Sequence, residues 1–515
     1  MRLSELIAAL PDDLAPTQWV CTDQAIDPVI RGICYDSRLV SPGDLFVALA
    51  GSVNDGHLFL GRAQELGAAA LLVQAPPENA DTSTCPAIVV PDSRRALAPI
   101  SMHFFGEPSE ELDLVGITGT NGKTSTGYLV ESILSAAGAA TGLIGTVEIR
   151  YANEKIAATN TTPESLDLQR TLRSMRTEAI EAVVMEVSSH GLELGRVRGC
   201  LFKVAGFTNL TQDHLDFHPD MQAYLASKCL LFGEHMAEGG TAVVNIDDSS
   251  SAAVIAAAMK AGAKILRCSR NSQANAQIKL LGAEIRLAGT RAQVDLGGEV
   301  IEIDLPLLGD FNLENLLVAC GIATAMGVAP DAVARGVAEC PQVPGRMEVV
   351  SDTSEDNPTV IVDYAHTPDA VEKLLQAVRP LSKGRVITVF GCGGDRDRGK
   401  RRLMAEAVAG NSDLTIATSD NPRTEDPEQI LRDVEVGLSM LELCKPEELG
   451  EHHGRYSIIS DRREAIECAV RTAEAPDTVV LAGKGHEDYQ IVGSRKLPFD
   501  DRDEARKALA LRSSQ

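Results

Sequence analysis

Residues 114–126 carry the sharpest chemical pattern of the chain: LVGITGTNGKTST, an apolar run, a glycine-rich turn, then Lys123 and Thr124. Glycines allow successive backbone N–H groups to curl around a phosphate, and the N-terminus of a following helix adds a positive dipole end. Lys123 would neutralise β- and γ-phosphate oxygens, and Thr124 would hold Mg²⁺. The strict P-loop spacing fails because Ile117 stands where its first glycine belongs, so this is a variant GTNGKT loop that begins at Gly119. The alternative is a tight turn with an exposed lysine, but the combined features favour ATP or GTP binding.

Two further strand-like runs end in side chains suited to a metal ion. AVVMEVSSHG places Glu186 at a strand end together with Ser188, Ser189 and His190. GFTNLTQDHLDFH places Asp213, His214, Asp216 and His218 just past another strand. Ligands collect beyond the carboxyl ends of parallel strands, so these groups are expected near the phosphate loop, with Glu186 and His214 as candidate metal ligands. Mg²⁺ and Zn²⁺ both stay open, as does a solvated loop with locally bonded histidines.

Polar side chains also follow each strand-like run of the last third. Arg396 follows VITVF, Asp420, Asn421 and Arg423 follow LTIATS, and Glu487 follows VVLAG. Arginine clamps a carboxylate in a bidentate fashion, and a neighbouring acid holds an ammonium, so the set predicts a site for an amino acid. For GGDRDRGKR alone, an alternating-charge surface loop is the alternative.

The elements that must position these groups alternate as in an α/β protein. From residue 111 on, apolar runs such as LDLVGIT, AVVMEVS and TAVVNID alternate with Ala- and Leu-rich helical stretches, which is typical of βαβ units around a parallel sheet. Residues 278–307 instead show alternating β-type residues and glycine turns, which predicts an antiparallel addition at the sheet edge. Polar breaks near 106–111 and 341–346 divide the chain into three predicted domains, 1–108, 109–343 and 344–515.

Composition excludes several functions. The chain has 515 residues and a formal net charge of −25, which argues against general binding of nucleic acid or anionic membrane. Its eleven cysteines are scattered without a CxxC pair, as expected of reduced thiols in the cytoplasm. The opening stretch lacks the h-region of a secretory signal, and no eighteen consecutive residues are apolar. We therefore expect a cytoplasmic, monomeric protein without membrane insertion.

The chain resembles the Mur ligases over nearly its whole length. The motifs that carry the resemblance occur in the same order: GTNGKT, MEVSSHG, TNLTQDHLDFH, GDFNLEN, VPGRME, DYAHTPDA, FGCGGDRDRGKR, DNPR and GKGHEDYQ, with an amino-terminal DSR element. The resemblance implies a small α/β UDP-binding domain, a central P-loop ATPase-like domain with a parallel sheet, and a carboxy-terminal Rossmann-like domain that binds the incoming amino acid.

The resemblance also implies an activity. The implied activity is that of an ATP- and Mg²⁺-dependent amide ligase of peptidoglycan synthesis, which joins meso-2,6-diaminopimelate to UDP-N-acetylmuramoyl-L-alanyl-D-glutamate. In the family ATP converts the terminal carboxylate to an acyl phosphate, which the amine then attacks. Phosphorylation corrects the poor leaving group of a carboxylate, and cations offset the charge that develops.

Site residues carry over position by position. Lys228 matches the family lysine that is carbamylated and joins Thr124, Glu186 and His214 around Mg²⁺; a plain lysine on a helix surface is the alternative. The implied catalytic residues are Lys123, Glu186, His214 and Lys228. The implied ATP-binding residues are Gly119, Thr120, Asn121, Gly122, Lys123, Thr124, Ser125, Asn312, Asn315, Arg346 and Asp363. The implied residues for the UDP-linked peptide are Ser37, Asn160, Thr161, Thr162, Ser188 and Arg196, whereas Leu194 departs from a glutamine that some relatives use.

DNPR is the implied specificity element. In the family it accompanies diaminopimelate, whose second carboxylate pairs with the arginine, here Arg423. The implied amino-acid pocket contains Arg396, Asp420, Asn421, Pro422, Arg423, Gly483 and Glu487. Lysine would leave this guanidinium unpaired, which disfavours it.

Other functions stay open on the sequence. They are a relative that adds lysine or a D-alanyl dipeptide, a folylpolyglutamate synthetase, and a regulatory NTPase. No NKxD guanine-reading motif is present, and a regulatory NTPase would not need the amino-acid pocket.

Overall fold

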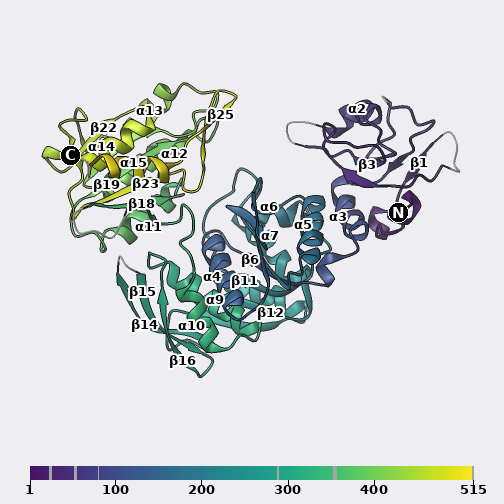
Figure 1. The fold of residues 1–515 in the computed structure, drawn as a ribbon, viewed down its shortest axis with the longest axis horizontal. Coiled ribbons are helices and arrows are strands. Elements are labelled where there is room, and N and C mark those ends of the chain that lie inside the picture. Colours follow the sequence, from purple (N-terminus) through teal and green to yellow (C-terminus); the bar gives the residue numbers. More distant parts are fainter. Residues whose placement is uncertain (22–25, 52–54, 79, 287–288, 352–356, 513–515) are drawn as a thin grey trace. The chain divides into compact units, whose positions relative to one another are not determined.

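The computed structural model describes residues 1–21, 26–51, 55–78, 80–286, 289–351 and 357–512. It is an α/β protein, as predicted, with three main sheets (Figure 1). Two compact units are distinguished: one comprises residues 1–281, 294–301 and 314–339, and the other 282–293, 302–313 and 340–515. Among the described residues, no helix is both long and apolar enough to cross a bilayer.

The first sheet is five-stranded, in the order β1-β5-β4-β3-β2. Strands β2 to β5 pair in parallel and β1 is antiparallel to β5. The runs DLFV and ALLV form β3 and β4 and are buried along their whole length, as expected of central parallel strands covered on both faces. The bounds are β1 Gln18–Val20, β2 Gly32–Cys34, β3 Asp44–Val47, β4 Ala70–Val73, β5 Ala87–Val89, α1 Leu3–Ala8, α2 Leu60–Glu65 and α3 Ser93–Phe104, with short 3-10 turns η1 Asp12–Leu14 and η2 Gly56–Phe59.

The second sheet has eleven strands, in the order β16-β15-β14-β13-β12-β11-β6-β10-β7-β8-β9. Its centre is parallel from β13 to β7, and β8 and β9 add an antiparallel extension. The predicted edge addition is present as β14, β15 and β16, and β14 joins β13 in parallel. The strands are β6 Asp113–Thr118, β7 Thr141–Ile144, β8 Glu148–Tyr151, β9 Glu154–Ala157, β10 Ala182–Glu186, β11 Phe202–Phe207, β12 Met236–Asn245, β13 Lys264–Ser269, β14 Ile278–Arg286, β15 Gly289–Leu296 and β16 Val300–Leu305.

Helices cover both faces of the parallel centre of this sheet. Apolar side chains of α5, α7 and α8 share one core cluster with β6, β10, β11 and β12. Helix α9 packs its Val318 and Ile322 against Gly206 of β11 on the other face, where α4 and α10 lie together (Figure 1). The helices are α4 Lys123–Ala136, α5 Ser165–Thr177, α6 Ser189–Glu193, α7 Met221–Glu234, α8 Ser251–Lys260, α9 Asn312–Ala325 and α10 Pro330–Ala338, with the turn η3 Pro108–Glu110.

The third sheet has seven strands, in the order β17-β18-β23-β19-β20-β22-β21, and is parallel from β18 to β21. Its apolar faces form two core clusters, one on each side. The strands are β17 Glu348–Val349, β18 Thr359–Asp363, β19 Val386–Cys392, β20 Leu414–Ser419, β21 Glu442–Leu443, β22 Arg455–Ile458 and β23 Thr478–Ala482, followed by the hairpin β24 Tyr489–Val492 and β25 Arg495–Pro498. The helices are α11 Pro368–Val378, α12 Gly399–Asn411, α13 Pro427–Glu435, α14 Arg462–Thr472 and α15 Asp501–Arg512, with turns η4 Val436–Leu438 and η5 Leu449–Glu451.

Candidate functional site

The glycine-rich loop joins the central strand β6 to the N-terminus of α4, as predicted. Gly119 and Gly122 have φ angles of +153° and +85°. A Cβ atom would lie 1.9 Å from Thr208 Oγ1 at the first and 2.0 Å from Asn315 Oδ1 at the second. Only glycine fits at these two positions, so the backbone curls closely enough to present N–H groups to an anion.

Lys123 folds back over this loop. Its Nζ donates to the carbonyl oxygens of Gly119, at 2.9 Å, and Thr120, at 2.8 Å. The loop is also tied to the next strand end, because Asn209 accepts from Asn121 N through its side chain and from Thr120 N through its carbonyl. The Lys123 ammonium is therefore held against the carbonyl oxygens of its own loop.

Glu186 ends β10, which pairs in parallel with β6, so its carboxylate lies beside the start of α4. The residue is 2% exposed. It accepts hydrogen bonds from Thr124 Oγ1 at 3.1 Å, Thr146 N at 2.8 Å and Thr146 Oγ1 at 2.9 Å. Two predicted metal ligands, Thr124 and Glu186, are thus in direct contact.

Lys228, on α7, is a buried lysine and not one on a helix surface. It is 1% exposed, and its Nζ donates to Gly119 O at 2.8 Å and lies 4.3 Å from the centre of the Tyr224 ring. Burial, and next to it the charge of Lys123, holds the pKa of Lys228 well below its usual value. Burial thus shifts the protonation equilibrium of this amine toward its neutral, nucleophilic form.

His214 lies in an aromatic cluster beside the loop. Its backbone is left-handed (φ 54°), and its ring meets that of His190 edge-on with centroids 4.8 Å apart. His190 in turn lies over Phe217, and His218 is 3% exposed. Burial lowers the pKa of His214, and burial followed by the neighbouring His214 lowers that of His190 to about 4. The histidine rings therefore pack against one another, while the His214 side chain remains 41% exposed and Leu215 and Phe217 face solvent.

Most residues predicted for the UDP-linked peptide gather around Glu186. Thr162 is fully buried and donates through Oγ1 to Glu186 O at 3.0 Å, while Ser188 N donates to the same Oγ1 at 2.9 Å. Arg196 donates to Thr162 O at 3.1 Å, and Thr161 lies within hydrogen-bond distance of Thr146. Asn160 is exposed just before these threonines, and Ser37 follows β2 in the first sheet. No hydrogen bond among the described residues joins Ser37 or Asn160 to this group.

In the second unit, the ends of β20 and β23 come together as predicted. Asn421 Nδ2 donates to Glu487 Oε2 at 2.9 Å. Lys484, which is fully buried, donates to the same oxygen and to Asp420. These contacts bring three of the predicted pocket residues into one cluster.

Arg423 is held beside this cluster by backbone contacts. It has a left-handed backbone (φ 51°), and its N–H donates to Ile491 O of the β24–β25 hairpin at 3.0 Å. Its Nη1 donates to Gly394 O at 2.7 Å. Among the described residues, the Arg396 side chain makes one long hydrogen bond, from Nη1 to Asp395 O at 3.4 Å. Pro422 O and the Gly483 backbone also lie at this edge. A Cβ atom at Gly394 would lie 1.9 Å from Pro422 O, and a Cβ atom at Gly483 would lie 3.6 Å from Asp420 Oδ2.

The residues predicted near adenosine are distributed over both units. Arg346 stacks on the Tyr364 ring at 4.5 Å, and Asp363 accepts from Met347 N and Ala365 N at 2.7 Å each. Burial raises the pKa of Asp363. Asn312 donates to Leu308 O in the same unit, whereas Asn315 belongs to the first unit and contacts the phosphate loop.

Three residues that contact the loop or Glu186 were not singled out from the sequence: Thr146, Asn209 and Tyr224. Thr146 follows β7 and Asn209 follows β11, so the rule that ligands collect at the carboxyl ends of strands could have found both. Tyr224 lies inside α7, where its hydroxyl is 3.1 Å from Thr120 Oγ1, and no local pattern indicates this contact.

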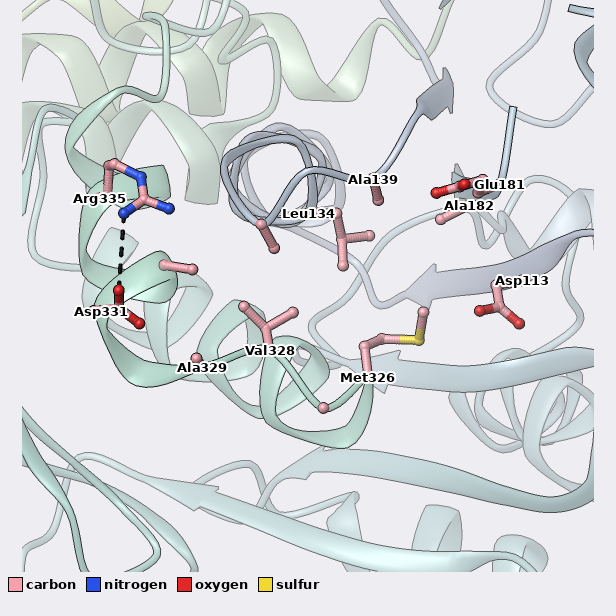
Figure 2. Close-up of a pocket in the computed structure, with 13 residues that line it drawn as sticks. Asp113, Leu134, Ala139, Glu181, Ala182, Met326, Val328, Ala329, Asp331 and Arg335 are labelled. Atoms are coloured by element: carbon pink, nitrogen blue, oxygen red, sulfur yellow. Dashed lines mark ion pairs between the residues drawn. The ribbon is translucent and has the colours of Figure 1, made fainter. Parts of the chain in front are cut away.

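A cavity of about 470 Å³ lies elsewhere, at the opposite end of the large sheet (Figure 2). Asp113 and Ala182, which begin β6 and β10, line it together with Met326, Val328 and the ion pair Asp331–Arg335. None of the predicted site residues lines it, so it plays no part in the site described above.

The parallel sheet with a glycine-rich loop between β6 and α4 is the fold of an ATP-dependent ligase, and the comparisons with known proteins agree. Residues 29–104 match the Mur ligase family catalytic domain, 117–323 the Mur ligase middle domain, and 345–485 the Mur ligase glutamate ligase domain. The chain belongs to the Mur ligase family.

Several similar proteins are ligases with the same name. UDP-N-acetylmuramoyl-L-alanyl-D-glutamate–2,6-diaminopimelate ligase of Geobacter metallireducens is 43% identical, with 94% of this chain and 95% of that protein covered. The protein of the same name from Gloeobacter violaceus is 44% identical, with 100% and 99% covered. A solved structure of a ligase with this name has a TM-score of 0.65 at 34% identity, covering 94% of this chain and 95% of that one. The ligase MurF of Thermotoga maritima, solved with ADP, has a TM-score of 0.64 at 17% identity and shares the fold.

Proposed function

We propose that this protein is an ATP-dependent ligase that joins meso-2,6-diaminopimelate to UDP-N-acetylmuramoyl-L-alanyl-D-glutamate in peptidoglycan synthesis. The names of the similar full-length ligases support the reaction. The observation that carries the choice of amino acid is the cluster of Arg423, Asn421 and Glu487 at the ends of β20 and β23. A guanidinium beside an acid suits an amino acid with a further carboxylate.

In the first step the terminal carboxylate of the acceptor attacks the γ-phosphorus of ATP, and ADP leaves. The loop from Gly119 to Ser125 would hold the phosphates, and Lys123 would shift from its own loop carbonyls to the transferring oxygens. Asn315 supports the loop, and Asn312, Arg346 and Asp363 are assigned to adenosine. After this shift its ammonium would stabilise the negative charge on the phosphoryl oxygens in the transition state.

The donor set fits Mg²⁺. The hydroxyl of Thr124 and the carboxylate of Glu186 are hard oxygen ligands only 3.1 Å apart, and His214 lies in the cluster beside the loop. Lys228 fits the carbamate expected from the family because burial shifts its amine toward the neutral form, which can attack CO₂ and lose a proton to become an anion. Bound Mg²⁺ would offset negative charge on the phosphoryl group.

In the second step the amine of diaminopimelate attacks the acyl phosphate, phosphate leaves, and the nitrogen loses a proton. Arg423 keeps Nε and Nη2 without a hydrogen bond among the described residues, so two donors are available for a carboxylate. Arg396, Asp420, Pro422, Gly483 and Glu487 complete the pocket. Lysine, lacking the distal carboxylate, would leave this guanidinium unpaired, which costs affinity.

The acceptor is assigned to the first unit. Thr161, Thr162, Ser188 and Arg196 surround the Glu186 strand end, where the dipeptide would lie, with Asn160 beside them and Ser37 toward the uridine nucleotide. We assign the three domains to residues 1–108, 109–343 and 344–515; each matched family segment lies inside one of them. The enzyme would act in the cytoplasm as a monomer, without nucleic acid.

Phosphate release tests this function. The purified protein is given ATP, Mg²⁺ and the UDP-linked dipeptide, with either meso-diaminopimelate or lysine. We expect release that requires the dipeptide and is far faster with diaminopimelate, and transfer of isotopic oxygen from the acceptor carboxyl into phosphate. Hydrolysis independent of the dipeptide would favour a regulatory NTPase, and a preference for lysine would overturn the choice of amino acid.

A further inference from the structure

Lys484 lies directly beneath the amino-acid pocket. It follows β23, is fully buried, and its Nζ lies 3.1 Å from Glu487 Oε2 and 3.4 Å from Asp420 Oδ1. The two carboxylates are closer to solvent, with side chains 17% and 11% exposed. A buried ammonium is costly unless it is paired, so this lysine is fixed by the two acids and fixes them in return.

In the carboxylates of Asp420 and Glu487, one oxygen each accepts the side-chain hydrogen bonds of the described residues. Among the described residues, both side-chain donors to Glu487, Lys484 and Asn421, end on Oε2. The donor to the Asp420 carboxylate likewise ends on Oδ1. Each acid therefore turns one oxygen inward to the lysine and keeps the other, Oε1 or Oδ2, without a donor from the described chain.

The charge balance points to the ligand group. The Lys484 ammonium balances one of the two carboxylates, and Arg423 is assigned to the distal carboxylate of the ligand, so one negative charge remains for a cationic group of the ligand. The nearby Arg462 does not alter this balance, because it forms a fully buried ion pair with Asp501 at 2.6 Å. Two outward oxygens with one net negative charge suit a single ammonium group.

We propose that Lys484 is a positioning residue for the incoming amino acid: it orients Asp420 and Glu487 so that their outer oxygens hold an ammonium of diaminopimelate. This inference rests on the proposed function and deepens it, since it names a residue that does not touch the ligand. Without the lysine, the inner oxygens lose their cation, and the two like charges repel each other.

The test compares Lys484→Met with Lys496→Met in the full-length protein. Lys496 is a matched control because it is an exposed lysine whose Nζ lies 3.7 Å from the centre of the Tyr489 ring on the same hairpin. We expect Lys484→Met to raise the KM for diaminopimelate at least about thirtyfold, the lower end for loss of one partner of a buried charge pair. The KM for ATP and for the UDP-linked dipeptide should stay within about twofold, and Lys496→Met should change none of the three.

A merely structural role is separated by a double-mutant cycle with Glu487→Gln. If Lys484 acts through the acids, the double variant raises the KM for diaminopimelate by much less than the product of the single effects. The proposal would be overturned if the two single effects multiplied in the double variant. Equal rises in the KM values for diaminopimelate, ATP and the UDP-linked dipeptide would also overturn it. If Lys484→Met does not fold, Lys484→Gln takes its place, with a smaller but still selective rise expected, because the amide can donate to Glu487 without a charge.

Calorimetric titration with meso-diaminopimelate, in the presence of the UDP-linked dipeptide and a non-hydrolysable ATP analogue, keeps two failures apart. If the unmodified protein binds no diaminopimelate, the proposed function fails. If it binds and Lys484→Met binds with the same affinity, the positioning role fails while the function stands.

Discussion

Arg423 shows how one side chain can set the substrate of the second unit. Its backbone is left-handed and is held from both sides by the hairpin strand, by Arg423 N to Ile491 O and Gly493 N to Arg423 O. One donor is used on Gly394 O, which fixes the direction of the guanidinium. A planar cation held in this way can discriminate by charge and by geometry, which a flexible lysine would not do.

Arg423→Ala should therefore act on one substrate only. We expect the KM for diaminopimelate to rise about a hundredfold, from about 3 kcal/mol lost with a charge-assisted pair, while the KM for ATP is nearly unchanged. Initial rates with each substrate varied in turn measure this. Arg402→Ala, which removes an exposed arginine paired with Glu406 on α12, is the control. Unchanged affinity for diaminopimelate in Arg423→Ala would remove this residue from the pocket.

His486 gives the second unit a pH-dependent stability. Its pKa is lowered to about 3 by burial, with Arg346 and Arg502 adding repulsion, whereas a free histidine has a value of 6.5. As the pH falls, the unfolded chain therefore binds a proton at this histidine at a higher pH than the folded chain does. The stabilisation is complete above pH 6.5 and is lost progressively as the pH falls toward 3.

His486→Gln should flatten this dependence. We expect the free energy of unfolding to fall less steeply between pH 6.5 and 4 than in the unmodified protein, by at most about 1.4 kcal/mol per pH unit. Urea unfolding at a series of pH values measures the slope. His453→Asn changes an exposed imidazole and serves as the control; an identical slope in His486→Gln would contradict the assignment.

At the scale of elements, the sequence predicted the strand ends well because strand, turn and helix are encoded locally. The runs that end at Thr118, Glu186 and Ser419 are β-strands, and the polar residues after them do converge at the carboxyl edge of their sheets. Contacts between distant segments were not predictable. The burial of Lys228 under the loop and the pairing of Arg423 with Ile491 depend on how whole elements pack, which no local pattern records.

The turn between β6 and α4 permits a matched test of the phosphate loop. Gly122→Ala would place a Cβ 2.0 Å from Asn315 Oδ1 at a φ of +85°, so the loop must shift. We expect the KM for ATP to rise at least about tenfold, since strain and displacement together exceed the roughly 1.4 kcal/mol that tenfold requires. Gly138→Ala, at φ +94° with nothing within 4 Å of its Cβ, carries the same backbone strain without the clash. Equal KM values for ATP in the two variants would show that the close approach at Gly122 does not shape the loop.

At the scale of the whole molecule, the chemistry is divided between two compact units. Lys123, Glu186 and Lys228 belong to the first, and Arg346, Arg423 and Glu487 to the second. The proposed reaction needs groups from both units, so whether each unit is stable by itself is a property worth testing.

A buried ion pair between Arg462 and Asp501 stabilises the second unit. Both side chains are completely buried, and Arg462 also donates to Ala482 O at the end of β23. Asp501 begins α15, so the pair ties the last helix to the centre of the sheet beneath the amino-acid pocket. Removing one partner leaves a buried charge unpaired, which costs about 3 to 5 kcal/mol.

Asp501→Asn tests whether the two units unfold separately, because the chain's single tryptophan, Trp19, lies in the first unit. We expect urea unfolding followed by circular dichroism to show a transition at lower urea in the variant, while the Trp19 fluorescence transition stays where it is. Asp503→Asn is the matched control: this neighbouring acid is 64% exposed in its pair with Arg506, and exposed pairs contribute at most about 1 kcal/mol. A fluorescence transition that moves together with the dichroism transition would mean that the two units unfold as one.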